Sequence, residues 1–559
     1  MTPSRASQAG STTRLRRRIL AWAGALAVAV TVLIPRATPA LQGPETEADW
    51  SRWIDQQIST RWQAEGITPA VACDDSSFQR RVYLDLAGRI PTMDEHLAFV
   101  KDADPRKRTR LVDSLLSAPS YGERMRDVFD VVFMGRGPGE RRGGRRRGEV
   151  AGGDYRGQWL EYLRDSFQQN RPWDRLVSDL LQARPQSKAD SGSVWFLYAR
   201  QEKYQDIAEA ISPAVFGLQV QCAQCHDHPL ADEIKQAHYW GLVAFFNRGK
   251  NKATPAGPRV AESAIGGFSS FALLAGGSKP AELTFLGGEP IAEKRPADNE
   301  KEMDAPELYD PGSASEEPPV PKFSRRQQFV ERFVLRNPLV AKAAVNRFWA
   351  LLMGRGIVHP VDKMDSAHPP SHPELLSGLA ERFAASGYDT RKLVRSIVLS
   401  RSYGLAAKPI DKVQPDRFAY GIEKPLTGEA LASSLSVAVT GKVSPPDTEL
   451  KASLVNVFPD VFVEENLSSL RQSMFLTNSP VFNKLFQPSP GSVVDRLVGI
   501  EDPRVRVKQA FQTALHRDPE PDELDAAAQF LVARKSRPRE ATAQFYWALV
   551  SGPEFRFNH

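Results

Sequence analysis

Apolar residues recur at helical spacing along most of the chain. Trp50, Trp53, Ile54 and Ile58 fall on one face of a predicted helix, and Thr92–Glu95 is a capping box that opens another. Comparable apolar stripes run through Leu111–Leu116, Tyr121–Phe133, Gln158–Phe167, Phe329–Trp349, Leu393–Val398, Val505–Leu515 and Pro521–Ala533. The pattern therefore predicts a mainly α protein.

The segment 251–322 breaks this pattern. Gly, Pro, Ala and acidic residues dominate it, and no sustained helical period is visible. We expect only short strands there, such as Glu282–Leu286, which Gly287 would end. The composition predicts two helical domains, 41–250 and 323–559, joined by this irregular segment.

The N-terminus has the pattern of an export signal. Arg14 and Arg16–Arg18 form a positive region, Ile19–Ile34 is almost wholly apolar, and Ala37–Ala40 offers small residues for cleavage. Residues 1–40 are therefore predicted to be a signal peptide, with an uncleaved membrane anchor as the alternative. The protein is expected to be exported to the periplasm or cell envelope, with membrane association only through this segment.

The predicted signal peptide also accounts for the positive net charge of the chain. The formal net charge is +6 and the sequence pI is about 9.0. All six basic residues of the segment 1–40 are arginines, and that segment has no acidic residue, so the remainder is close to neutral. A generally basic nucleic-acid-binding protein is therefore not indicated.

The run Cys222-Ala223-Gln224-Cys225-His226 is the strongest chemical signal in the sequence. C-x-x-C-H is the pattern by which haem c is attached covalently, the two thiols adding to the porphyrin and the imidazole binding the iron. The pattern predicts a cofactor site made of Cys222, Cys225 and His226. It lies between the helical stretches Asp206–Val220 and Glu233–Phe246, at a helix-to-loop corner.

Two other interpretations of this corner remain open. The cysteines could form a disulfide or redox pair, which suits an exported protein. Alternatively, His226 and His228 could bind zinc together with the thiolates, although no second Cys or His pair completes a strong zinc signature. The other interpretation of His228 and His238 is a surface or hydrogen-bonded histidine. His372 stands in a Pro-rich helix entry of the second region, and we expect it to approach the corner as a metal ligand or a supporting residue. The alternative is that His372 caps or packs beside its own helix.

Several longer strings carry a family resemblance. They are Phe78–Thr92, Gln221–Pro229, Asn337–Pro338, Val345–Trp349, Gly354–Val358, Pro369–Leu376, Ser400–Tyr403 and Glu554–His559. In these strings the chain resembles exported, planctomycete-type, cytochrome-like proteins that join the domain-of-unknown-function families fifteen-forty-nine and fifteen-fifty-three. The first resemblance covers roughly residues 50–248 and the second roughly residues 323–559.

The resemblance implies a cytochrome-like character without an established biochemical role. The chain departs from an ordinary small c-type cytochrome, because the box ends a helical region and the nearest downstream methionine is Met303. One hypothesis is a haem-bearing electron-transfer protein with an unknown redox partner. The other is a non-catalytic binding or assembly protein whose Cys/His cluster is a disulfide or zinc clip. No G-x-S-x-G hydrolase motif is present, and the sequence does not decide whether the protein is an enzyme.

Overall fold

The computed structural model describes residues 47–136, 155–297, 300–310, 317–458, 461–462 and 469–559. The predicted signal peptide, residues 1–40, lies outside the described residues, so its cleavage or anchoring stays a prediction. Across the described ranges, no helix combines the length and the apolar character that crossing a membrane requires.

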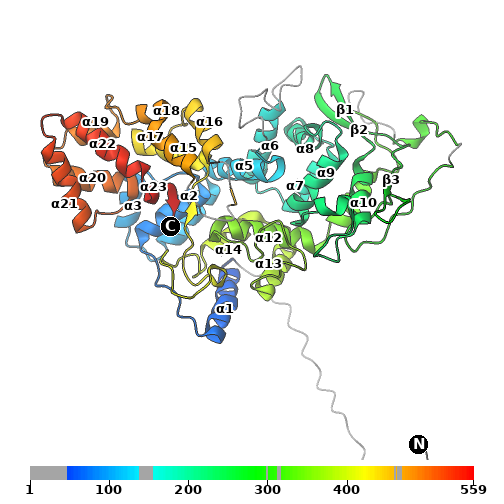
Figure 1. The fold of residues 1–559 in the computed structure, drawn as a ribbon, viewed down its shortest axis with the longest axis horizontal. Coiled ribbons are helices and arrows are strands. Elements are labelled where there is room, and N and C mark those ends of the chain that lie inside the picture. The colour runs from blue at the N-terminus through cyan, green and yellow to red at the C-terminus, as the bar shows by residue number, and fades with distance from the viewer. Residues whose placement is uncertain (1–46, 137–154, 298–299, 311–316, 459–460, 463–468) are drawn as a thin grey trace, which may run out of the picture. The chain divides into compact units, whose positions relative to one another are not determined.

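The N-terminal region is built from short helices joined by tight turns (Figure 1). Its α-helices are α1 (Glu47–Glu65), α2 (Asp75–Leu86), α3 (Met93–Lys101), α4 (Lys107–Ser117), α5 (Pro119–Met134), α6 (Tyr155–Gln168), α7 (Trp173–Gln182), α8 (Trp195–Tyr198), α9 (Tyr204–Ile211) and α10 (Gln236–Phe246). Two 3-10 turns, η1 (Lys188–Val194) and η3 (Gln221–Gln224), and a π-helical turn, η2 (Ser212–Phe216), join them. The predicted capping box is confirmed: Thr92 and Glu95 exchange side-chain-to-backbone hydrogen bonds at the start of α3.

The middle segment contains two small antiparallel hairpins. They are β1 (Gly249–Thr254) with β2 (Gly257–Glu262), paired from Gly249↔Glu262 to Thr254↔Gly257, and β3 (Ser270–Ala272) with β4 (Ser278–Pro280); a 3-10 turn, η4 (Pro306–Leu308), follows. The predicted strand Glu282–Leu286 is wrong, because only one bridge, Leu283↔Ile291, forms there. This stretch packs instead against α10, where a Cβ on Gly241 would lie 2.2 Å from the carbonyl oxygen of Thr284.

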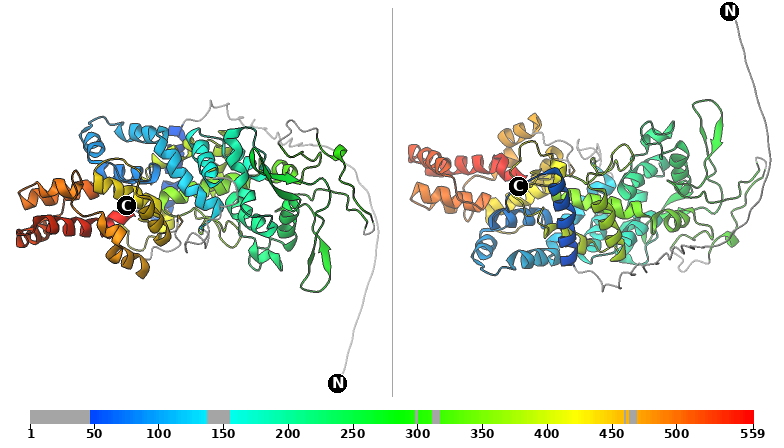
Figure 2. Two further views of the ribbon diagram at one scale, coloured as in Figure 1. Left: turned by 90° about the horizontal axis from the view of Figure 1, so that it is seen from above. Right: turned by 90° about the horizontal axis from the view of Figure 1, so that it is seen from below.

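The C-terminal region is again helical. Its elements are α11 (Arg325–Phe329), the π turn η5 (Val330–Val334), α12 (Pro338–Met353), α13 (Pro373–Ala385), α14 (Thr390–Val398), η6 (Pro415–Arg417), β5 (Lys424–Pro425), α15 (Gly428–Thr440), α16 (Thr448–Val457), α17 (Leu470–Asn478), α18 (Pro480–Lys484), α19 (Val493–Val498), α20 (Pro503–Leu515), α21 (Pro521–Ala533), α22 (Pro538–Ser551), α23 (Pro553–Arg556) and β6 (Phe557–Asn558). Helices α20 and α21 lie side by side (Figures 1 and 2). The prediction of a mainly α protein is therefore confirmed.

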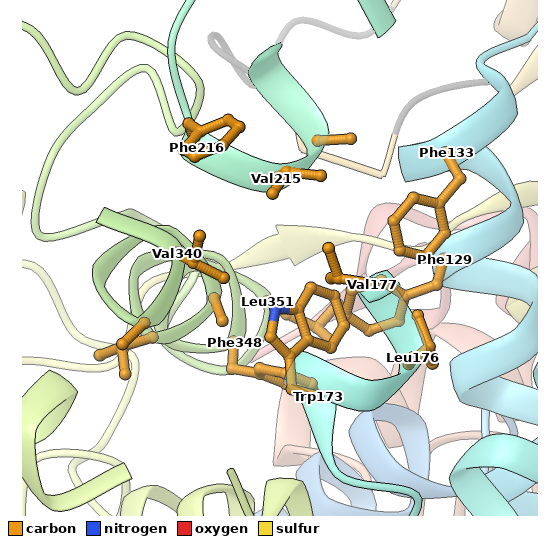
Figure 3. Close-up of a cluster of buried hydrophobic side chains, with 14 of the residues drawn as sticks. Phe129, Phe133, Trp173, Leu176, Val177, Val215, Phe216, Val340, Phe348 and Leu351 are labelled. Atoms are coloured by element: carbon orange, nitrogen blue, oxygen red, sulfur yellow. The ribbon is translucent and has the colours of Figure 1, made fainter. Parts of the chain in front are cut away.

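The larger hydrophobic core joins residues from both sides of the irregular segment. On α5, the Phe129 ring lies 4.8 Å from that of Phe167 and 5.2 Å from that of Phe348 on α12. Trp173 of α7 packs against the same Phe348 ring at 5.9 Å (Figure 3). Apolar faces of the two predicted domains are therefore buried against each other. That the two are separate domains stays a prediction.

A second core holds the C-terminal helices together. It is formed by buried apolar residues of α15 to α23, including Phe482, Phe486 and Tyr546. Leu84 of α2 and Ile90, which follows α2, belong to the same cluster. The C-terminal helices therefore pack around residues from the start of the described chain.

Candidate functional site

The chain enters the C-x-x-C-H box from an irregular helix end. Helix α9 passes into the π turn η2, which widens the helix and is stopped by Gly217 in the left-handed conformation, with φ of 68°. Arg347 of α12 is buried and donates hydrogen bonds to the carbonyls of Pro213 and Ala214, at 2.7 and 2.9 Å. Burial lowers the pKa of Arg347 to about 10, which still leaves it charged at neutral pH.

The corner itself is held by two side chains of α10. The Gln236 amide donates to the carbonyl oxygens of Gln224 and Cys225, at 3.2 and 3.0 Å, and its backbone N–H donates to the Asp227 carboxylate at 2.9 Å. The Trp240 indole N–H also donates to the Gln224 carbonyl, at 3.0 Å. The backbone carbonyls that the turn leaves unpaired thus receive hydrogen bonds from side chains of α10. These bonds fix the backbone of the box against α10.

The two cysteines of the box stand at the surface. Cys222 and Cys225 are both exposed and neither forms a disulfide, while Ala223 between them is fully buried. The buried alanine anchors the turn and the thiols on either side of it face solvent. Two accessible thiols three positions apart, followed at once by an imidazole, match the donor set of covalent haem attachment.

A contact with the backbone indicates which ring nitrogen of His226 carries the proton. Its Nδ1 lies 2.6 Å from the carbonyl oxygen of Asp227. A carbonyl only accepts, so Nδ1 must carry the proton and the neutral ring keeps its lone pair on Nε2. The ring is exposed, and the Nε2 lone pair is the one that a metal ion or haem iron would use.

His228 has the opposite tautomer. Its Nδ1 accepts hydrogen bonds from the backbone N–H groups of Leu230 and Ala231, at 3.3 and 3.0 Å. His238 does the same for the N–H of Lys235, at 3.1 Å. In the neutral rings the proton is therefore on Nε2, and the one lone pair is already used. His228 is a hydrogen-bonded turn residue in this structure, and its role as a metal ligand stays a prediction.

His372 lies beside an aromatic ring, with charged groups nearby. It is buried, its Nδ1 is 3.1 Å from the Ser371 hydroxyl, and its ring packs 5.5 Å from that of Phe418. Burial lowers the pKa of His372 to about 4, with a further contribution from the charges of Arg61 and Arg417. The described residues contain no group of three or more His, Cys, Asp or Glu arranged to hold a metal, so the predicted set of His226, His228 and His372 is not brought together.

A different part of the second region reaches the corner. Gln219 donates to Asp362 at 2.8 Å, and the backbone N–H of Met364 donates to Gly217 at 2.8 Å. Beyond the box, Ser366 donates to Glu233 through both its N–H and its hydroxyl, each at 2.7 Å. The segment 362–366 therefore contacts the chain on both sides of the box.

This segment continues into His368, a residue that the sequence did not single out. His368 Nδ1 lies 2.7 Å from the Asp365 carboxylate, whose side chain is buried. The carboxylate holds the Nδ1 proton and leaves Nε2 with its lone pair, as at His226. A His three residues after an Asp was the only sequence signal for this arrangement, and it is a weak one.

Comparison with known families supports the resemblance in part. The model of PSCyt2, described as a protein of unknown function (DUF1549), matches residues 53–251, and that of PSD1, described as a protein of unknown function (DUF1553), matches residues 325–452. These are the two families that the sequence strings resemble. No curated protein and no solved structure matches the chain significantly.

Proposed function

We propose that the protein carries one covalently attached haem c and transfers single electrons. Cys222 and Cys225 would hold the haem through thioether links, and His226 would bind its iron through Nε2. The observation that carries this proposal is the His226 ring, whose Nδ1 proton is held by the Asp227 carbonyl while Nε2 stays exposed with its lone pair. When bound, haem supplies one-electron redox chemistry at a potential set by its ligands and surroundings.

The protein's part in this function is to hold the attachment loop in place. Gln236 and Trp240 hold the Gln224 and Cys225 carbonyls, so the thiols and the imidazole keep fixed positions relative to α10. Because the thiols are exposed, a group attached to them is accessible to a redox partner at the surface. Attachment outside the cytoplasm agrees with the predicted export signal.

The test is haem staining after denaturing electrophoresis, because only a covalent link survives denaturation. The protein is matured in a host competent for cytochrome c assembly, and the unmodified chain should stain. The double variant Cys222→Ser/Cys225→Ser should not stain, whereas Cys73→Ala, at the buried cysteine, should stain as the unmodified chain does. An unmodified protein with neither stain nor Soret absorption rules out the proposal.

The alternative is a non-catalytic binding or assembly protein. The exposed, unpaired thiols favour it, because a C-x-x-C pair in an oxidising compartment can close to a disulfide or hold zinc with His226. In that case the protein shows no haem stain. Thiol counting before and after reduction then identifies a disulfide, and elemental analysis identifies zinc.

The segment 362–368, which contacts the chain on both sides of the box, would supply the candidates for a further iron ligand. We favour His368, because the Asp365 carboxylate orients its ring and leaves Nε2 free. The sulfur of Met364 packs against Gly217, only 2.7 Å from where a Cβ would stand. His368→Gln should therefore change the haem spin state in absorption and electron paramagnetic resonance spectra, and Met364→Leu should not. The reverse pattern would assign Met364 instead.

A further inference from the structure

A group of buried basic side chains lies where the start of the described chain meets its C-terminal helices. It consists of Arg80 on α2, His96 on α3 and His516, which follows α20, and we call it the histidine joint. All three residues are buried, and the two imidazole rings lie 5.1 Å apart. The joint shares no residue with the C-x-x-C-H box or with the segment 362–368, so the haem proposal does not use it.

The hydrogen bonds of His516 fit only its neutral form. Its Nδ1 lies 3.2 Å from Arg80 Nη1, and a guanidinium only donates, so Nδ1 is the acceptor. Its Nε2 lies 2.9 Å from the carbonyl oxygen of Pro91, which only accepts, so Nε2 carries the proton. Burial and the charge of Arg80 hold the pKa of His516 well below its usual value. A second proton, at Nδ1, would replace the hydrogen bond with a contact between two cations.

His96 adds a second titratable ring to the joint. Its Nδ1 lies 2.9 Å from Oε1 of Gln79, whose amide nitrogen donates to the Glu95 carbonyl at 2.9 Å. That bond turns the amide oxygen of Gln79 towards His96, so Nδ1 is the donor. Burial lowers the pKa of His96, and the charge of Asp74 opposes this shift. Protonation of both histidines would therefore place two further positive charges beside Arg80.

The carboxylates around the joint already have partners. The charged or titratable groups around it are Asp74, Arg89, Glu95, Arg517, Glu523, Glu554 and His559. Their ion pairs are Arg517 with Glu523 at 2.7 Å and with Glu554 at 2.5 Å, and Arg89 with Glu95 at 2.8 Å. Asp74 caps α2 by accepting from the Ser77 N–H, and the other printed hydrogen bonds of Arg80 go to backbone carbonyls. Added protons in the joint are therefore poorly compensated.

We propose that the histidine joint is an acid-sensitive switch between α2–α3 and the C-terminal helices. At neutral pH both imidazoles are neutral, and hydrogen bonds from one side of the joint to the other keep it closed. Below about pH 6, an open joint whose imidazoles reach water takes up protons that the closed joint excludes. Acid therefore favours the open form, which uncovers Ile90 and Leu515 of the second core.

Opening is measured by hydrogen exchange on the full-length protein at pH 7.5 and pH 5, with each rate divided by the intrinsic exchange rate at that pH. A histidine that gains its proton only in the open form makes opening about thirtyfold more frequent at pH 5 than at pH 7.5. We therefore expect the protection of α3 and of the end of α20 to fall by about thirtyfold or more. Protection that does not change with pH in either helix would overturn the proposal.

Variants locate the titrating groups. His516→Asn keeps an acceptor towards Arg80 and suits the left-handed backbone at this position, with φ of 59°, but it cannot be protonated. It should reduce the fall in protection about thirtyfold. If it does not fold, His96→Asn, which keeps a donor towards Gln79, should still reduce the fall. His372→Gln removes a buried histidine outside the joint and is the control, so the fall in α3 and α20 should remain. A full fall in both joint variants would show that these imidazoles do not control opening.

Discussion

At the scale of residues, the histidines around the box differ in which ring nitrogen carries the proton. His226 donates from Nδ1 to a carbonyl, whereas His228 and His238 accept at Nδ1 from backbone N–H groups. Three imidazoles within a short stretch of sequence therefore have two different functions. One is available to a metal centre, and the other two close turns that shape the corner.

Gln236 is the residue on which the corner depends most. Gln236→Met keeps the side-chain volume but removes the donor that serves the Gln224 and Cys225 carbonyls. We expect a loss of about 1 kcal/mol in unfolding free energy, since the Cys225 carbonyl loses this donor while the Gln224 carbonyl keeps Trp240. Urea unfolding measures this loss, and hydrogen exchange at Cys225 and His226 should accelerate. Gln221→Met, at an exposed side chain, should change neither quantity, and a wild-type value for Gln236→Met would contradict the argument.

The lowered pKa of His372 is expected to make the stability of the folded protein depend on pH. Its pKa is about 4 in the folded protein, against about 6.5 unfolded, because burial disfavours its charged form. The unfolded chain therefore binds more protons as the pH falls below 6.5, and stability present at neutral pH is lost on acidification towards pH 4. At pH 5 the loss from this residue is about 2 kcal/mol.

The measurement is urea unfolding at pH 7.5 and pH 5. His372→Gln should reduce the difference between the two pH values by about the amount given above. Ser371→Ala removes the hydroxyl beside Nδ1 but keeps the titrating ring, so it should retain most of the difference. An unchanged pH dependence in His372→Gln would show that this ring does not control it.

At the scale of elements, the end of the chain is tied to its beginning by a buried ion pair. Lys424 of β5 lies 2.7 Å from Asp85 of α2, which also accepts from the Tyr403 hydroxyl at 2.8 Å and from the Asn558 amide of β6 at 2.9 Å. Burial lowers the pKa of Lys424, and the Asp85 charge opposes that shift. One carboxylate thus connects a helix with both strands of the antiparallel pair β5–β6, which are far apart in the sequence.

Removing that carboxylate's charge should be costly. Asp85→Asn leaves the Lys424 ammonium buried without a counter-charge, and we expect a loss of about 3–5 kcal/mol in unfolding free energy. The double variant Asp85→Asn/Lys424→Met should recover part of it, because the unpaired charge is gone. Asp525→Asn, at an exposed ion pair, should change stability by less than about 1 kcal/mol. Equal losses in the single and double variants would contradict this account.

At the scale of the whole molecule, the larger core links the two sequence regions. Phe348 packs on Phe129 and Trp173, so separating the regions would expose aromatic surface on both. A specific protease site is inserted after Met303, which is 81% exposed, and the purified protein is cleaved there. We expect the two fragments to co-elute on gel filtration until denaturant is added. Elution as two folded monomers would instead show that the regions are independent domains.

The sequence alone was sufficient for properties that depend on near neighbours. Helical periodicity identified the fold class, the Thr92–Glu95 capping box was read correctly, and C-x-x-C-H located the exposed corner. These features are encoded within one or two turns of chain, where spacing determines which residues share a face. The two family models match residues 53–251 and 325–452, which contain all of the strings that carry the resemblance except Glu554–His559.

Tertiary structure decided everything that depends on residues far apart in the chain. The buried ion pairs of Glu262 with Arg184 and Arg326 form only when α11 meets β2 and the loop after α7, and His368 becomes a candidate ligand only because its segment contacts both sides of the box. The burial of His372 beside Phe418 likewise comes from packing that local sequence does not encode, and its approach to the box stays a prediction. The sequence determines which side chains are present, but long-range packing determines their protonation, burial and hydrogen-bond partners.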